Sequence, residues 1–266
     1  MAPFTKPAPL AGPAAILPEL VIPARFRGPS GSGNGGYVCG RVAAYADGPV
    51  AVTLRRPPPL AAPMTVEPGG DGSLRVRHGS TLVAEATPSP DLLAAEVPDP
   101  VSLTEARASR GRARYFQDPV FPECFVCGTG RRPGDGLRIF PGPVPGRAVW
   151  AAPWTPDSSV AGPDGRVSPE VAWAVLDCPS GIAVAEQAGL DQGTAVVLGR
   201  MTASLAALPA PGDQCRVIAW PDGADGRKLT AGSALLGPGG EVLALARAVW
   251  VTVPRPARAL AAAGSS

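Results

Sequence analysis

The chain has 266 residues, of which 45% are hydrophobic and 17% charged, and its formal net charge is +2. That length accommodates one large domain or two fused units of about 100–150 residues each, and the scattered cations form no basic stripe that would favour nucleic-acid binding. No apolar run reaches the roughly 20 residues of a membrane span, and prolines interrupt the N-terminal segment where a signal peptide needs an unbroken apolar core.

In chain order, residues 1–20 predict a loosely packed arm, and residues 21–120 predict a first α+β unit. A glycine-rich loop at 28–36 leads into an apolar segment at 37–46, which we expect to be helical. Strand-like runs bounded by turn residues follow it. These runs span 50–56, 63–67, 73–79 and 81–87.

Residues 121–254 repeat this order, and residues 255–266 predict a tail. A loop at 161–167 precedes an apolar segment at 169–185, and four strand-like runs follow at 194–208, 214–220, 227–236 and 241–253. A helix that is apolar on every side must be buried, and a curved antiparallel sheet wrapped around it satisfies that demand. The repeated order predicts a tandem duplication of such a unit. A generic β-rich domain with two coincidental helices is the alternative.

Residues 124–185 also carry a family pattern. The sequence reads CFVCG at 124–128, continues through Gly136-Leu137 to an aromatic-rich strand, and enters the second predicted helix with Asp177 inside it. This arrangement resembles the hotdog thioesterases of the phenylacetyl-CoA thioesterase type. The resemblance implies a double hotdog fold, a site between subdomains or subunits, and hydrolysis of an acyl-CoA or carrier-bound acyl thioester without a cofactor.

The chain departs from that family at both helix entries. Where the family has His-Gly-Gly with an acid nine positions after the His, the second half has Ser168-Pro169-Glu170 followed by Asp177. The first half has Asn34-Gly35-Gly36, with Ala43 in place of the acid. One interpretation is a composite site in which the glycines of one half face Asp177 of the other. Decay of both sites is the other interpretation.

Asp177 is the strongest candidate for catalysis. Burying a lone carboxylate in an apolar helix costs several kcal/mol unless hydrogen bonds compensate for it or its pKa rises. A raised pKa suits a general base that activates water. The structural alternative is that Pro179 breaks the helix and that Asp177 caps the segment after it.

The other candidates would bind substrate. Ser168 before Pro169 predicts a helix N-cap whose free N–H groups could polarise a thioester carbonyl. Glu170 fits the first helical turn or a second acid near the thioester. The glycines after Asn34 allow close approach of a ligand, or form a flexible loop. Trp173 would line an acyl tunnel or belong to the core.

The cysteines and the single histidine add little chemistry. Cys124 and Cys127 form a CxxC, but a zinc ribbon needs a second pair or histidine partners, so we predict a tight turn with buried thiols and no metal. The odd, sparse set of five cysteines indicates a reducing, cytoplasmic location. His78 is expected at a hairpin turn, where it would be solvent-exposed or structural. One histidine also argues against a hydrolase triad and against the dehydratase branch of the hotdog fold.

Two other functions compete with hydrolysis. The same scaffold would serve as a non-catalytic binder of acyl or other apolar ligands, or as a structural protein with vestigial sites. The exposed sheet edges of such a fold favour assembly into a homo-oligomer.

Overall fold

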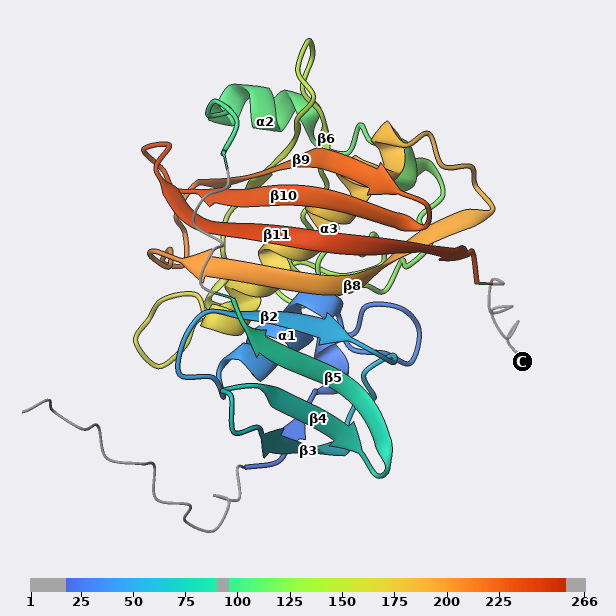
Figure 1. Ribbon diagram of the computed structural model, residues 1–266. Coiled ribbons are helices and arrows are strands. Elements are labelled where there is room, and N and C mark those ends of the chain that lie inside the picture. The colour runs from blue at the N-terminus through green and yellow to red at the C-terminus, as the bar shows by residue number, and fades with distance from the viewer. Residues whose placement is uncertain (1–17, 90–95, 257–266) are drawn as a thin grey trace, which may run out of the picture.

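The computed structural model describes residues 18–89 and 96–256. Within these residues, eleven antiparallel strands form one sheet in the order β1-β3-β4-β5-β2-β8-β11-β10-β9-β7-β6 (Figure 1). The helices are α1 (Gly35–Ala43), α2 (Leu103–Ser109) and α3 (Pro169–Gln187). The strands are β1 (Leu20–Val21), β2 (Val50–Leu54), β3 (Pro63–Pro68), β4 (Leu74–His78), β5 (Thr81–Pro88), β6 (Gly142–Pro143), β7 (Trp150–Trp154), β8 (Thr194–Leu205), β9 (Cys215–Asp225), β10 (Lys228–Leu236) and β11 (Val242–Pro254).

The two halves of the sheet have the same strand order. Apart from the two-residue edge strand β6, each half has one strand before its long helix and four after it: β1 and β2–β5 around α1, and β7 and β8–β11 around α3. Their orders are β1-β3-β4-β5-β2 and β7-β9-β10-β11-β8. The halves join where β2 pairs antiparallel with β8, with Val52 opposite Met201. The sheet is therefore continuous across the centre of the molecule.

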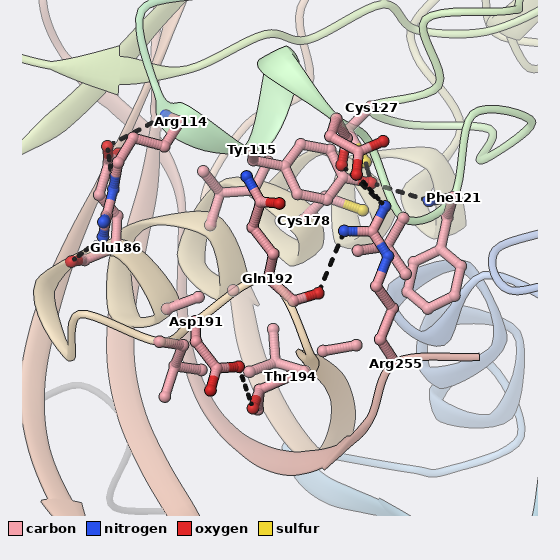
Figure 2. A pocket seen from close by; sticks show the side chains of 18 of the residues that line it. Arg114, Tyr115, Phe121, Cys127, Cys178, Glu186, Asp191, Gln192, Thr194 and Arg255 are labelled. Carbon is pink, nitrogen blue, oxygen red and sulfur yellow. Dashed lines mark hydrogen bonds and ion pairs between the residues drawn. The ribbon is translucent and has the colours of Figure 1, made fainter. Parts of the chain in front are cut away.

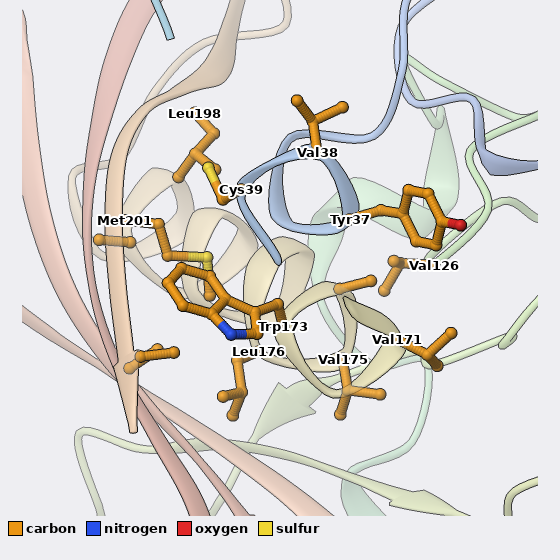
Figure 3. Close-up of a cluster of buried hydrophobic side chains, with 14 of the residues drawn as sticks. Tyr37, Val38, Cys39, Val126, Val171, Trp173, Val175, Leu176, Leu198 and Met201 are labelled. Carbon is orange, nitrogen blue, oxygen red and sulfur yellow. The ribbon is translucent and has the colours of Figure 1, made fainter. Parts of the chain in front are cut away.

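Both long helices lie against one face of this sheet, α1 behind β2 and α3 behind β8–β11 (Figure 1). α3 is buried along most of its length, as its all-round apolar sequence predicts. Its side chains Trp173 and Leu176 pack in one cluster with Cys39 of α1 and Leu198 and Met201 of β8 (Figure 3). The core thus runs beneath both halves of the sheet.

Pro179 does not end α3, which continues to Gln187. The alternative in which Asp177 caps a new segment is therefore wrong. Proline removes one backbone hydrogen bond and crowds the preceding turn, but packing on all sides holds this helix together. Within the same stretch the Ser180 hydroxyl donates to the Asp177 carbonyl at 2.8 Å.

A second layer covers the opposite face of the sheet in the second half. α2 packs there against β7 and β9. Ile218 and Trp220 point into this layer, whereas Val217 and Ala219 face the helices. Arg216 is 7% exposed and its guanidinium donates to the carbonyls of Val101 and Gly237. The sequence did not predict this layer.

The ends of the described chain are packed against the fold. Leu20, the last residue of the predicted arm, is fully buried in β1 opposite Met64, so the arm ends earlier than predicted. Arg255, the first residue of the predicted tail, pairs with Asp118 at 2.8 Å. Residues 1–17 and 257–266 lie outside the described residues. Within the described ranges, no helix combines the length and hydropathy that crossing a membrane requires.

Candidate active site between the two long helices

The site is built by an unusually close contact between α1 and α3. A Cβ on Gly36 would lie 2.5 Å from the Asp177 Cβ and 2.7 Å from the Trp173 carbonyl oxygen. A Cβ on Gly40, one turn later, would lie 2.7 Å from the Glu170 Cα. The helices therefore run antiparallel, and their glycines let the two backbones touch. This contact sets the N-terminus of α1 against the middle of α3.

Asp177 turns its carboxylate toward that N-terminus. Its Oδ2 accepts from the Gly36 N–H at 3.0 Å and from the Asn34 side-chain amide at 2.8 Å. Asn34 also caps α1, because its Oδ1 accepts from the Tyr37 N–H at 3.0 Å. Asp177 and Asn34 are each 2% exposed. The Asp177 Oδ1 is also buried, and it has no hydrogen-bond partner among the described residues.

The electrostatics of Asp177 reflect this burial. The pKa of Asp177 is raised to about 7, chiefly by loss of water on burial and to a smaller extent by negative charge at Cys124. The Gly36 N–H and the Asn34 amide act in the opposite direction, because they stabilise the ionised form. The two compensations predicted from the sequence, hydrogen-bond partners and a raised pKa, therefore occur together.

Three thiols adjoin this carboxylate. The Cys178 Sγ lies 3.5 Å from the Cys124 Sγ, and these two sulfurs and that of Cys127 all lie within 4.8 Å of one another. Hydrogen bonds from the thiols of Cys127 and Cys178 lower the pKa of Cys124 well below its usual value. The predicted tight turn with buried thiols is present at 124–127. The sequence did not indicate that Cys178 joins it, although Cys178 follows Asp177 directly.

A cavity of about 250 Å³ lies next to the thiols (Figure 2). Tyr115, Cys127 and Cys178 form part of its wall, together with the apolar side chains of Phe121 and Ile182. The rest of its wall mixes apolar and polar side chains, and the polar ones include Arg114, Glu186, Asp191, Gln192, Thr194 and Arg255. Of the residues that the structure describes, neither Asp177 nor Trp173 lines this cavity.

The other predicted site residues lie apart from Asp177. Ser168 occupies the N-cap of α3, but its side chain makes no capping hydrogen bond. Asp177 lies nine positions further along the chain, which is about 13 Å along the helix axis. Glu170 lies at the Gly40 end of the helix contact. Trp173 is 5% exposed within the core (Figure 3).

Gly35 is held by packing, since a Cβ there would lie 2.8 Å from the Leu198 Cβ. His78 is exposed at the end of β4, one of the two environments predicted for it. Of the predicted site residues, the structure therefore brings Asn34, Gly36 and Asp177 into direct hydrogen-bond contact.

No family model matches the chain, and no curated protein matches it. Solved structures do match. A thioesterase from Haemophilus influenzae is 15% identical with a TM-score of 0.40, covering 46% of this chain and 83% of its own. A mutant thioesterase from Pseudomonas aeruginosa is 17% identical with a TM-score of 0.42, covering 47% and 88%.

The PaaI protein from the phenylacetic acid degradation operon of E. coli is 13% identical with a TM-score of 0.37, covering 41% of this chain and 75% of its own. Each of these three similarities takes in less than half of this chain.

Proposed function

We propose that the chain is a tandem duplicated hotdog, with subdomains at 21–120 and 121–254, that hydrolyses an acyl-CoA or a carrier-bound acyl thioester. The identical strand order of the two halves supports the duplication. The sequence resemblance supplies the class of substrate. A cytoplasmic location and a homo-oligomeric state remain predictions from the sequence.

One observation carries the proposed activity: Asp177 of the second half meets the N-terminus of α1 from the first half. Helix N-termini present backbone N–H groups and a partial positive charge, which stabilise an oxyanion. Asp177 offers a carboxylate whose second oxygen is buried without a partner among the described residues. An oxyanion site and a base are thus contributed by different halves of the chain.

The proposed reaction uses these groups in order. The thioester carbonyl oxygen accepts the hydrogen bond from the Gly36 N–H, replacing the Asp177 Oδ2 as its acceptor. Asp177 accepts a proton from a water molecule as the water oxygen attacks the carbonyl carbon. The C–S bond then breaks, and the same proton passes from Asp177 to the departing sulfur. The products are a carboxylic acid and a free thiol.

Ligand binding without turnover is the second candidate, and the position of the cavity favours it. The wall of the cavity includes Cys178, whereas Asp177 next to it faces α1. A thioester in the cavity therefore has to pass the thiols of Cys127 and Cys178 to reach the carboxylate. A ligand that stops at those thiols would bind and not react.

Both candidates are tested with acyl-CoAs that range from acetyl to long-chain and arylacetyl. Free CoA is separated by chromatography, because the thiols of the chain would react with a colorimetric thiol reagent. We expect turnover by the wild type, its loss in Asp177→Asn and its retention in Asp225→Asn, which alters an exposed carboxylate at the end of β9.

Saturable binding with no turnover of any acyl-CoA would instead identify a binding protein. Neither binding nor turnover would favour the vestigial structural role.

A further inference from the structure

The three thiols next to Asp177 have the geometry of a metal site. Cys124 and Cys127 are 2% and 3% exposed, and they meet Cys178 of α3 from a loop that precedes it by about 50 residues. In a tetrahedral zinc site, Zn–S bonds of about 2.3 Å put neighbouring sulfurs about 3.8 Å apart. The three sulfurs here lie within 4.8 Å of one another, two of them at 3.5 Å, and all are free thiols.

The loop that carries the CxxC is shaped to aim its sulfurs. The Gly128 N–H donates to the Cys124 carbonyl at 2.9 Å, and a Cβ on Gly128 would lie 2.3 Å from that same oxygen. The turn therefore requires glycine.

Arg131 fixes this turn from the other side. Its guanidinium is 7% exposed and donates to the carbonyls of Glu123 and Arg25 at 2.9 and 2.8 Å. It also pairs with the Asp135 carboxylate at 2.8 Å. The positions of Cys124 and Cys127 are thus held by hydrogen bonds on both sides of the loop.

The remaining two cysteines, Cys39 and Cys215, serve as a comparison, because they are ordinary buried core residues. Cys39 and Cys215 are fully buried in the apolar core, and neither belongs to the group in which the sulfurs of Cys124, Cys127 and Cys178 converge. Filling the core accounts for these two. It does not account for three thiols that converge from a shaped turn and a separate helix.

We propose that Cys124, Cys127 and Cys178 bind a zinc ion as three thiolates, with a fourth coordination position toward the cavity. Cys127 and Cys178 line that cavity, which gives the ion a path of entry. The Tyr115 hydroxyl lies 3.7 Å from the Cys127 Sγ, beside the same position. Thiolate ligands favour zinc over magnesium or calcium. The site goes beyond the proposed hydrolysis and does not depend on it.

The test uses the metal alone. Reduced, metal-free full-length protein is titrated with CoCl₂, because cobalt in a tetrahedral thiolate site absorbs in the visible and near-ultraviolet. We expect the absorbance to saturate at one equivalent of cobalt and to include a sulfur-to-cobalt charge-transfer band in the near-ultraviolet. Adding ZnCl₂ should bleach both the visible and the near-ultraviolet absorption. Keeping the reductant present prevents a Cys124–Cys178 disulfide from competing. Protein that is folded by circular dichroism and yields no charge-transfer band contradicts the proposal.

Variants assign the ligands. Cys124→Ser and Cys178→Ser should each weaken cobalt binding by more than the roughly 10–100-fold that loss of an outer-shell partner costs. Cys39→Ser and Cys215→Ser, which alter buried cysteines outside the cluster, should bind cobalt like the wild type. If Cys178→Ser binds as tightly as Cys39→Ser, Cys178 is not a ligand and the three-thiolate site is wrong. None of these readouts requires turnover, so failure of the metal site and failure of the hydrolase are distinguishable.

Discussion

The Asn34 side chain both caps α1 and links it to Asp177 of α3. Its Oδ1 caps α1 at Tyr37, and its amide nitrogen donates to the Asp177 carboxylate. Because both Asn34 and Asp177 are 2% exposed, water does not replace either bond when it is lost. A buried polar group left without its partner costs more than the net gain from forming the bond.

We therefore expect Asn34→Ala to destabilise the protein markedly. Loss of an N-cap costs about 0.5–2 kcal/mol and loss of a hydrogen bond to a buried group about 1–3 kcal/mol, so the expected cost is about 1.5–5 kcal/mol. Urea unfolding measures it. Ser168→Ala is the matched control, because Ser168 occupies an N-cap without a capping bond, and its cost should stay below about 0.5 kcal/mol. Equal costs for the two variants would refute this account of Asn34.

The sequence alone predicts the role of a site residue when that role depends on neighbouring residues in the chain. Asp177 stands out because it is a lone acid in an apolar helix, and the Asn34 tripeptide stands out because it precedes a helix. Cys178 does not, because its role depends on a turn about 50 residues earlier folding against α3. Ser168 and Glu170 carry plausible chemistry at the entry to α3, but helix length places that entry about 13 Å from Asp177.

The contact between α1 and α3 depends on the absence of side chains. Gly36 and Gly40 lie one turn apart and face Trp173 and Glu170 of the other helix. In an ordinary helix, replacing glycine by alanine gains about 1 kcal/mol. Here the added methyl would force the two backbones apart.

Gly40→Ala should therefore lower the free energy of unfolding by about 1–3 kcal/mol, the usual cost of overpacking, despite its better helix propensity. Gly48→Ala is the control, because a Cβ there meets nothing within 4 Å; its effect should stay within about 0.5 kcal/mol. Denaturant melts of both variants measure the difference. A stabilised Gly40→Ala would show that the helices are not in close contact.

At the scale of elements, periodicity and turn residues predict the long elements well. The expected strands at 194–208, 214–220, 227–236 and 241–253 correspond to β8–β11. Short elements such as β1 and α2 were not predicted, because two to seven residues carry little periodicity. Pro179 wrongly suggests a helix break, because burial of the whole of α3 outweighs the low helix propensity of proline.

Over the whole molecule, the two halves share a sheet and a core. β2 pairs with β8, and side chains of α1, α3 and β8 lie in a single cluster. Neither half can unfold without exposing the face that the other covers. We therefore expect the chain to unfold as one cooperative unit.

The distribution of tryptophan makes this testable, because all five tryptophans lie at 150–250, in the second half. Tryptophan fluorescence reports mainly that half, although Trp173 packs against α1. Far-ultraviolet circular dichroism reports both halves. The two urea midpoints should coincide, as they do for a two-state transition. Separate midpoints would mean that the halves are independent domains.

The repeated order of elements is visible in the sequence, whereas the way in which the halves join is not. The β2–β8 pairing links residues about 150 positions apart, and the layer held by Arg216 covers a face that the strand pattern leaves open. Both depend on contacts between distant segments, which alternation along a single strand does not specify.

The central claim is that Asp177 of one half and the α1 N-terminus of the other form one catalytic site. It is tested most directly by the ratio of kcat/KM for wild type and Asp177→Asn on the best acyl-CoA. The asparagine oxygen can still accept from Gly36 and Asn34, so the fold is kept while the base is lost. General-base catalysis predicts a fall of at least about 100-fold. A folded Asp177→Asn variant that retains wild-type kcat/KM would contradict the claim.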